Sequence, residues 1–251
     1  MRQTIVTRAI VLRRVAYGEA DWVVTLLGRS TGHVSALARS ARKSTRRFAG
    51  GLGTAMVGEA NLQERPGADL MGLESFELVA DRPRLATDIA KAAHAAYAVE
   101  LCDRLCPARH PEPAVFDWLD EFLARLDAGL ATAERLRVLE LGLLRRLGIG
   151  PSLNRCVSCG RADLAGEQVR FHAAAGGVYC GNCARTGDIV TGAVRQALER
   201  LGSADLIDAE GISLASDIAV ACRRMLLALL REHIHGPLRS LDFIEKMSGS
   251  R

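Results

Sequence analysis

The sequence predicts an α+β protein of several domains, with a small all-β domain first and a helical domain after it. Three observations lead to this fold class. Apolar, β-branched runs separated by glycine turns occupy the first eighty residues. Alanine- and leucine-rich segments with helical spacing follow Pro83. Two Cys-x-x-Cys pairs stand between the third and the fourth of these segments.

The predicted all-β domain consists of five short strands. They cover residues 4–16, 21–28, 32–39, 53–65 and 68–79. Short strands rich in Val, Ile, Leu and Thr and joined by glycine-containing turns are typical of a small barrel or sandwich. The stretch SARKSTRRFAGGLG (40–53) is polar, basic and rich in glycine, so we expect a loop between the third and fourth strands.

The predicted helical domain has five helices, at residues 84–105, 111–129, 131–151, 191–203 and 214–237. Pro113 lies near the first turn of the second helix, and Gly148–Pro151 is a strong end for the third. In the first helix, the apolar residues predicted to share one face are Leu85, Ile89, Ala92, Ala96, Val99 and Leu105.

The cysteine-containing segment interrupts this helical domain. We therefore predict an N-terminal domain at residues 1–80, a helical domain at 81–150 together with 188–245, an inserted metal module at 151–187, and a flexible tail at 246–251. No internal repeat is visible in the chain.

Four of the seven cysteines have the spacing of a metal site. Cys156, Cys159, Cys180 and Cys183 form the pattern C-x2-C-x20-C-x2-C. Four thiolates make a closed tetrahedral site for one structural Zn²⁺, without an open position for catalysis. An iron–sulfur cluster and four buried thiols without metal remain alternatives. The other cysteines, Cys102, Cys106 and Cys222, are expected in the core.

Positive charge is concentrated at the start of the chain. Residues 1–47 carry ten basic residues and two acidic ones, an excess of eight positive charges in a chain whose net charge is +4. Such asymmetry favours an anionic partner, and nucleic acid is the first candidate. The alternative is a solvated charged face. The basic residues are Arg2, Arg8, Arg13, Arg14, Arg29, Arg39, Arg42, Lys43, Arg46 and Arg47.

The densest group of cations lies in RSARKSTRRF (39–48), at the start of the predicted loop, and this segment is called the basic loop. Five cations occur within nine positions, namely Arg39, Arg42, Lys43, Arg46 and Arg47. Guanidinium groups pair well with phosphate oxygens, whereas aromatic residues for base stacking are few in this region. We therefore expect binding that is dominated by phosphate contacts, depends steeply on salt and reads little sequence.

Several function classes find no support in the sequence. It has no P-loop, no G-x-S-x-G and no H-E-x-x-H motif, and the acidic residues Asp117, Asp120 and Glu121 are expected to lie solvated along a helix. We expect no enzyme activity. The start of the chain lacks the apolar core of a signal peptide, and no run is long enough to span a bilayer, so we expect a cytoplasmic protein without membrane contact.

The chain resembles the bacterial recombination mediator family RecO along nearly its full length. The strongest similarity is in AIVLRRVAYGEADWVVTLL (9–27) and TGHVSALARSARKSTRRFAGGL (31–52). A second similarity, LGIGPSLNRCVSCG (147–160), leads into the cysteines. The two Cys-x-x-Cys pairs match the zinc ligands of the family.

This resemblance implies an N-terminal OB-fold, a helical domain and an inserted zinc module. It implies binding of single-stranded and double-stranded DNA, annealing of complementary strands, and a nucleoid-associated role in recombinational repair. It also implies partnership with RecR, with RecF in the same pathway, and with the acidic C-terminal tail of the single-strand-binding protein. Together these proteins help to load the recombinase RecA. Two other functions compete with this one: a zinc-ribbon adaptor that acts mainly through protein partners, and a zinc-dependent nucleic-acid enzyme.

Overall fold

The computed structural model describes residues 3–44, 46–48, 50–64, 67–162, 164 and 167–249, without the side chains of residues 248 and 249. Its contacts divide the chain into two compact units. Unit 1 comprises Met1–Ala131 and Pro237–Arg251, and unit 2 comprises Thr132–Gly236. These boundaries differ from the domain boundaries predicted from the sequence, because the helical segments are shared between the two units.

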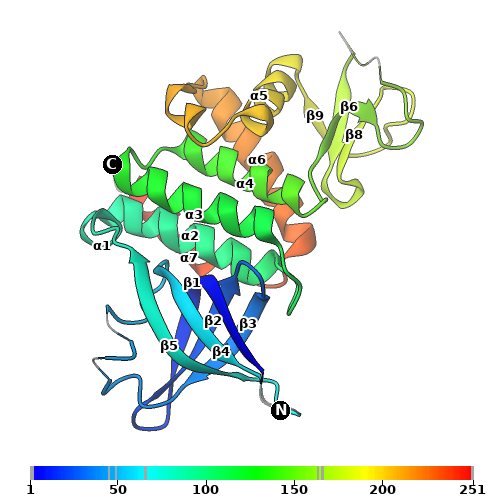
Figure 1. Cartoon of the computed structure of the whole chain (residues 1–251). Helices are drawn as coiled ribbons and strands as arrows, with labels where there is room; N and C mark the ends of the chain where they lie inside the picture. The colour runs from blue at the N-terminus through cyan, green and yellow to red at the C-terminus, as the bar shows by residue number, and fades with distance from the viewer. Residues whose placement is uncertain are drawn as a thin grey trace. The chain divides into compact units, whose positions relative to one another are not determined.

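Unit 1 begins with a closed five-stranded barrel, drawn in blue and cyan in Figure 1. The order around the barrel is β1-β2-β3-β5-β4, and β4 pairs with β1 to close it. All neighbours are antiparallel except β3 and β5, which are parallel. This is the five-stranded barrel of the OB type. Its strands are β1 (Thr4–Tyr17), β2 (Asp21–Gly28), β3 (Gly32–Ala38), β4 (Val57–Gln63) and β5 (Met71–Ala80).

Alternating apolar residues of these strands fill the barrel. Along β3 the residues alternate between buried and half-buried, as a strand with one face on the core requires. A register shift between Val11 and Arg13 bends β1, so that its first half pairs with β4 and its second half with β2. Phe48 and Leu52, which belong to the predicted loop rather than to a strand, are also buried in this core.

The helix predicted at residues 84–105 is two helices, α1 (Arg84–Thr87) and α2 (Ile89–Leu105). Asp88 separates them because its backbone is extended and its carboxylate accepts hydrogen bonds from the N–H groups of Ala90 and Lys91, which caps α2. The predicted apolar face is also wrong, since Ile89 is exposed and α2 is buried around most of its circumference. The reason is that β1, α1, α3 and α7 all pack against α2.

Two more helices complete unit 1. The helix α3 (Pro113–Ala128) has Pro113 in its first turn, as predicted, and packs beside α2. The helix α7 (Arg239–Gly249) was not predicted, and it overlaps the predicted flexible tail, whose last residues, 250–251, lie outside the described residues. Glu100 of α2 accepts hydrogen bonds from the N–H groups of Arg239 and Ser240 at 3.1 and 2.9 Å and thereby caps α7.

The helices of unit 2 are α4 (Ala133–Arg146), α5 (Gly192–Ser203) and α6 (Ser216–His233), with a short 3-10 helix, η2 (Asp208–Gly211). Threonine hydroxyls cap α4 and α5, since Thr132 accepts from the N–H of Arg135 and Thr191 from that of Val194. The three helices pack on one another around Leu139, Leu198 and Leu226, which are buried.

A small sheet completes unit 2, inserted between α4 and α5. Its order is β6-β8-β7-β9, and β6 and β8 are parallel. These strands were not predicted, because strands of three to five residues carry no period that can be read from the sequence. They are β6 (Ser152–Cys156), β7 (Val169–His172), β8 (Gly177–Tyr179) and β9 (Asp188–Val190), with the 3-10 helix η1 (Ala173–Ala175) between β7 and β8.

None of the described helices combines the length and the apolar character that a membrane crossing requires.

Candidate nucleic-acid interface and metal centre

The structure brings the four predicted metal ligands together. One sulfur atom from each of Cys156, Cys159, Cys180 and Cys183 lies within 4.8 Å of the other three. The pairing of β6 with β8 causes this, because Cys156 ends β6 and Cys180 directly follows β8. Cys156 and Cys180 are buried, whereas Cys159 is exposed and Cys183 is half-buried.

Both Cys-x-x-Cys pairs form the same tight turn. The N–H of Gly160 donates to the carbonyl of Cys156, and the N–H of Ala184 donates to the carbonyl of Cys180, each at 2.9 Å. Gly160 has a φ of +75°, a conformation that favours glycine. The two turns direct their sulfur atoms to a common point, as a tetrahedral metal site requires.

Neighbouring groups shift the pKa values of Cys156 and Cys183 in opposite directions. Burial raises the pKa of Cys156, but hydrogen bonds from the backbone of Cys159 and Cys180 outweigh it and lower the pKa to about 6. Hydrogen bonds to Cys180 and Cys159 raise the pKa of Cys183 to about 12. Without a metal the cluster therefore retains protons that a divalent cation would displace. Four converging sulfur donors fit a soft or borderline metal ion, so the cluster could hold one.

The predicted basic loop lies between β3 and β4. Its five cations are exposed, and the described part of residues 40–52 contains neither helix nor strand, as predicted. The loop is longer than predicted, because β4 begins at Val57 and not at residue 53. The loop is nevertheless anchored at its base. Phe48 is buried in the barrel core, and the carbonyl of Arg47 accepts a hydrogen bond from the N–H of Phe76 at 2.9 Å. The structure therefore holds the base of the loop against the barrel while its cations face solvent.

The start of the loop is fixed to the hairpin between β1 and β2. The N–H of Ser40 donates to the carboxylate of Asp21 at 2.7 Å, and the N–H of Arg42 donates to the carbonyl of Ala20 at 3.0 Å. The guanidinium of Arg42 reaches the carbonyl of Glu19 at 3.1 Å, and that of Arg47 reaches the carbonyl of Arg39 at 2.7 Å. Both arginines thus bind carbonyls, which leave their positive charge uncompensated.

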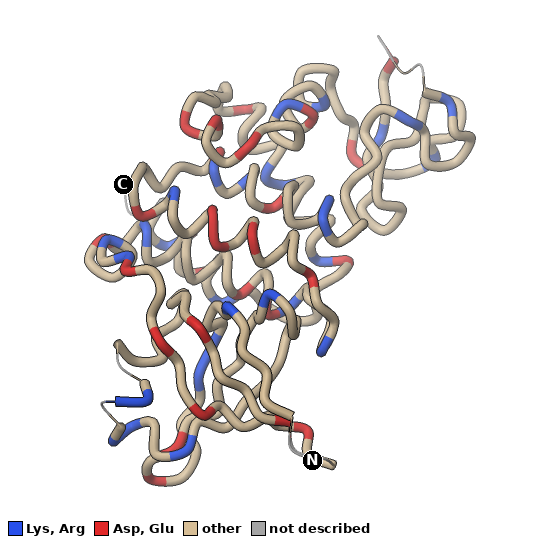
Figure 2. The backbone as a smooth tube through the Cα atoms, viewed as in Figure 1, with Lys and Arg blue, Asp and Glu red and all other residues tan. Residues whose placement is uncertain are grey.

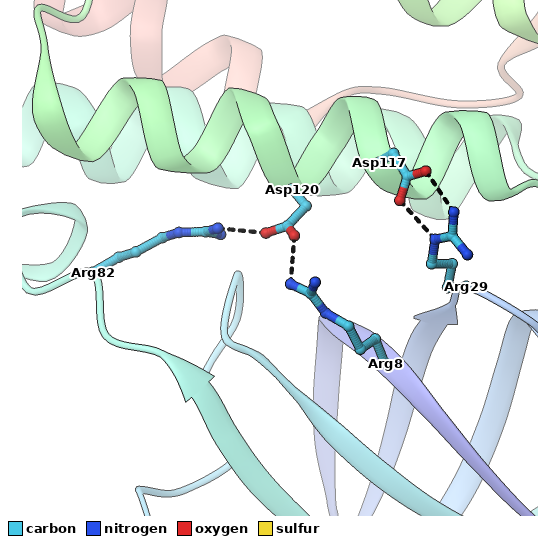
Figure 3. A network of polar contacts seen from close by, with 5 residues as sticks. All are labelled: Arg8, Arg29, Arg82, Asp117 and Asp120. Carbon is cyan, nitrogen blue, oxygen red and sulfur yellow. Dashed lines mark hydrogen bonds and ion pairs between the residues drawn. The ribbon is translucent and has the colours of Figure 1, made fainter.

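The ten N-terminal basic residues fall into two groups that the sequence did not distinguish. In the first group, arginines of the barrel pair with acids of α2 and α3, as Figure 3 shows for α3. Arg8 binds Asp120 at 2.7 Å, and Arg29 binds Asp117 through two hydrogen bonds at 2.8 and 2.9 Å. Arg82, from the end of β5, also binds Asp120. Asp117 and Asp120 are therefore not merely solvated, because arginines of unit 1 bind them, whereas Glu121 is exposed, as expected.

The third acid of this group, Asp103 of α2, lies between two barrel residues. It binds Arg13 at 3.1 Å and His33 at 2.9 Å. Burial raises its pKa, but the hydrogen bond from His33 and the charge of Arg13 outweigh burial and hold the pKa below its ordinary value. Its contribution to stability is therefore complete above the unfolded pKa and is lost as the pH falls through the lower, folded value.

The second group has no such partners. Arg14, Arg39, Arg42, Lys43, Arg46 and Arg47 form no ion pair with a carboxylate among the described residues. Arg2 lies outside the described residues. In Figure 2, the described part of the loop between β3 and β4 carries blue segments and lies beside the barrel, away from the helices of unit 1. Of this group, Arg14 is the residue that lies outside the basic segment 39–47. It adjoins Arg13 in the sequence, but strand alternation places the two side chains on opposite faces.

Taken together, these features define a class of protein with a closed five-stranded barrel, a basic loop on that barrel and, in a second unit, a cluster of four cysteines that could hold a metal ion. Comparison with known proteins then identifies the family. Residues 1–82 match the family model "Recombination protein O N terminal", and residues 86–242 match "Recombination protein O C terminal". The chain belongs to the RecO family of DNA repair proteins.

Relatives of this chain are similar to it over nearly their whole length. A DNA repair protein RecO from Anaeromyxobacter dehalogenans strain 2CP-C is 40% identical over 242 residues, which cover 95% of this chain and 94% of the relative. The protein of the same name from Myxococcus xanthus is 35% identical over 95% of this chain and 96% of the relative. The protein of the same name from Geobacter sulfurreducens is 34% identical over 96% of this chain and 97% of the relative.

Proposed function

We propose that this protein is a non-enzymatic DNA-binding mediator of recombinational repair. It binds single-stranded and double-stranded DNA and anneals complementary strands in the cytoplasm, at the nucleoid. The observation that carries the proposal is the basic loop, in which Arg39, Arg42, Lys43, Arg46 and Arg47 are exposed and face no carboxylate among the described residues. Cations that form no ion pair with a carboxylate are available to neutralise phosphates.

Annealing follows from the same chemistry. Two complementary strands repel each other through their phosphates, and a protein that neutralises part of this charge brings them close enough to pair. This requires no bond to be broken and no nucleotide to be hydrolysed. The proposal therefore includes annealing without ATP, on a surface that reads the backbone and leaves the bases free to pair.

The proposal extends to the partners implied by the family. The protein acts with RecR, within the pathway of RecF, and engages the C-terminal tail of the single-strand-binding protein, so that RecA is loaded on coated single strands. The four cysteines bind one structural Zn²⁺ and hold unit 2 in shape. Membership of the RecO family and the DNA repair names of the relatives support this part of the proposal.

The test is a loop variant with Arg42, Lys43, Arg46 and Arg47 replaced by alanine. Its affinity for single-stranded DNA is expected to fall at least about tenfold at low salt. The slope of log K against log salt is expected to decrease by about 0.7 for each phosphate that the variant no longer neutralises. Fluorescence anisotropy with a labelled oligonucleotide across a NaCl series measures both quantities, and a strand-annealing assay on the same variant measures function.

A control variant removes the same charge elsewhere. Arg104, Arg155, Arg185 and Arg231 are exposed, and replacing them with glutamine changes the net charge by the same amount. The control is expected to retain most of the affinity. Equal decreases in both variants would show that only net charge matters. Unchanged DNA binding by the loop variant, together with a stable complex with RecR or with the single-strand-binding protein's tail, would favour the adaptor instead.

A further inference from the structure

Two exposed arginines, Arg14 and Arg42, lie against the ring of Trp22. This ring is half-buried and packs against the barrel core. The guanidinium carbon of Arg14 lies 4.7 Å from the centre of this ring, and that of Arg42 lies 5.7 Å from it. These distances are within the range of cation–π attraction. One aromatic ring therefore brings together a cation of β1 and a cation of the loop, 28 residues apart in the sequence.

The fold accounts for this arrangement. In the pairing of β1 with β2, Arg14 is opposite Val24 and Ala16 is opposite Trp22. Arg14 and Trp22 are therefore diagonal neighbours on one face of the ribbon, within reach of a long side chain. Arg42 reaches the ring from the loop, whose backbone is bonded to the hairpin at Ala20. The arrangement thus depends on both the strand register and the loop anchor.

A guanidinium that lies against a ring has a restricted orientation but keeps N–H groups that can donate to an anion. Fewer rotamers must then be ordered when a ligand binds. Arg14 and Arg42 form no ion pair with a carboxylate among the described residues, so both can accept a phosphate as their counter-ion. Because cations and the core already contact the Trp22 ring, the ring orients arginines and does not serve as a platform for a base.

We propose that Arg14, Trp22 and Arg42 form a phosphate-binding site for the backbone of single-stranded DNA. Arg14 and Arg42 contact the phosphates, and Trp22 is a positioning residue that holds them. This inference rests on the proposed function and adds to it a contribution from β1, outside the basic loop. The site extends the binding surface from the loop to the hairpin between β1 and β2.

The experiment compares Arg14→Gln with Arg13→Gln in the full-length protein. The two residues are adjacent in β1 and their variants remove the same charge, but Arg13 is bound to Asp103. Binding to a fluorescein-labelled oligothymidylate is measured by anisotropy across a NaCl series. Arg14→Gln is expected to weaken binding about tenfold at low salt. It is also expected to reduce the salt slope by about 0.7. Arg13→Gln is expected to change neither.

Variants of Trp22 test the positioning role. Trp22→Phe keeps a ring and is expected to bind nearly as well as the wild type. Trp22→Leu is expected to weaken binding although the charge is unchanged. If Trp22→Leu fails to fold, as circular dichroism would show, the comparison of the two arginine variants still decides the matter.

Two outcomes separate this inference from the proposed function. Should Arg14→Gln behave like Arg13→Gln while the loop variant binds weakly, the site at Trp22 is overturned and DNA binding by the loop stands. Should neither Arg14→Gln nor the loop variant affect binding, the proposed function itself fails.

Discussion

The ion pairs that Asp117 and Asp120 of α3 form with arginines differ in how far they are shielded from water. Asp120 binds both Arg8 and Arg82. The side chain of Asp120 is 17% exposed, and that of Arg82 is 12% exposed. Asp117 and Arg29 form a pair whose side chains are about half exposed. A carboxylate that pairs with a shielded arginine contributes more to the free energy of unfolding than one in a solvated pair, because water and salt screen the solvated pair.

We therefore expect Asp120→Ala to lower the free energy of unfolding of unit 1 by about 1–3 kcal/mol, since it leaves Arg82 shielded and unpaired. Both tryptophans of the chain, Trp22 and Trp118, lie in unit 1, so tryptophan fluorescence during urea unfolding reports on this unit alone. Asp117→Ala is the control and is expected to lower the free energy of unfolding of unit 1 by clearly less. Equal costs would mean that shielding does not decide the strength of these pairs.

At the scale of elements, the small sheet of unit 2 is expected to depend on a metal ion held by its four clustered cysteines. Its strands have three to five residues, and two of the four ligands, Cys156 and Cys180, lie at or beside the pairing of β6 with β8. A sheet this short buries little apolar surface, so a bound metal is expected to supply much of its stability.

Cys156→Ser is expected to abolish metal binding and to loosen the segment that contains β6, β7, β8 and β9, while the barrel keeps its structure. Elemental analysis of purified protein measures metal per chain, with one Zn²⁺ expected in the wild type, and hydrogen exchange measures the loosening. Cys222→Ala, a buried cysteine of the same unit, should leave the metal in place. A finding of iron instead of zinc, or unchanged exchange after metal loss, would contradict the assignment.

The loop variant and Cys156→Ser also test whether the two candidate sites act independently. The cations of the basic loop belong to unit 1 and the cysteines belong to unit 2. A chain without its metal is therefore expected to bind single-stranded DNA with nearly unchanged affinity. A parallel loss of both properties would show that the metal centre contributes to the DNA-binding surface.

At the scale of the whole molecule, both ends of the chain belong to the same unit. The helix α7 follows unit 2 in the sequence but packs on α2 of unit 1, where Glu100 caps it. Truncation after Gly236 is therefore expected to destabilise unit 1 and not unit 2. Tryptophan fluorescence follows unit 1, and release of the bound metal to a chelating dye follows unit 2.

Glu100→Ala is the milder version of the same change. This substitution removes the cap of α7 without removing the helix. It is expected to lower the free energy of unfolding of unit 1 by about 1 kcal/mol. The truncated chain should be destabilised by more than this. If truncation changed the release of metal from unit 2 but left the tryptophan-monitored unfolding of unit 1 unchanged, the assignment of α7 to unit 1 would be wrong.

Local features of the sequence determined the five strands of the barrel, the loop between β3 and β4 and the four cysteines that the structure brings together. Strand alternation, glycine turns and Cys-x-x-Cys spacing act over a few residues, so they can be read directly. The same holds for α3, which was predicted at residues 111–129 with Pro113 near its first turn and which spans Pro113–Ala128.

Only the tertiary structure decided which arginines are available to an anion. Arg8 and Arg29 find their carboxylates 112 and 88 residues later in the chain. Arg14 meets Trp22 through a strand register, and Arg42 meets it through a loop anchor. The break at Asp88 and the docking of α7 likewise depend on groups brought together by folding. A charge count sums residues without their partners, and long-range interactions determine which of those charges remain available to an anion.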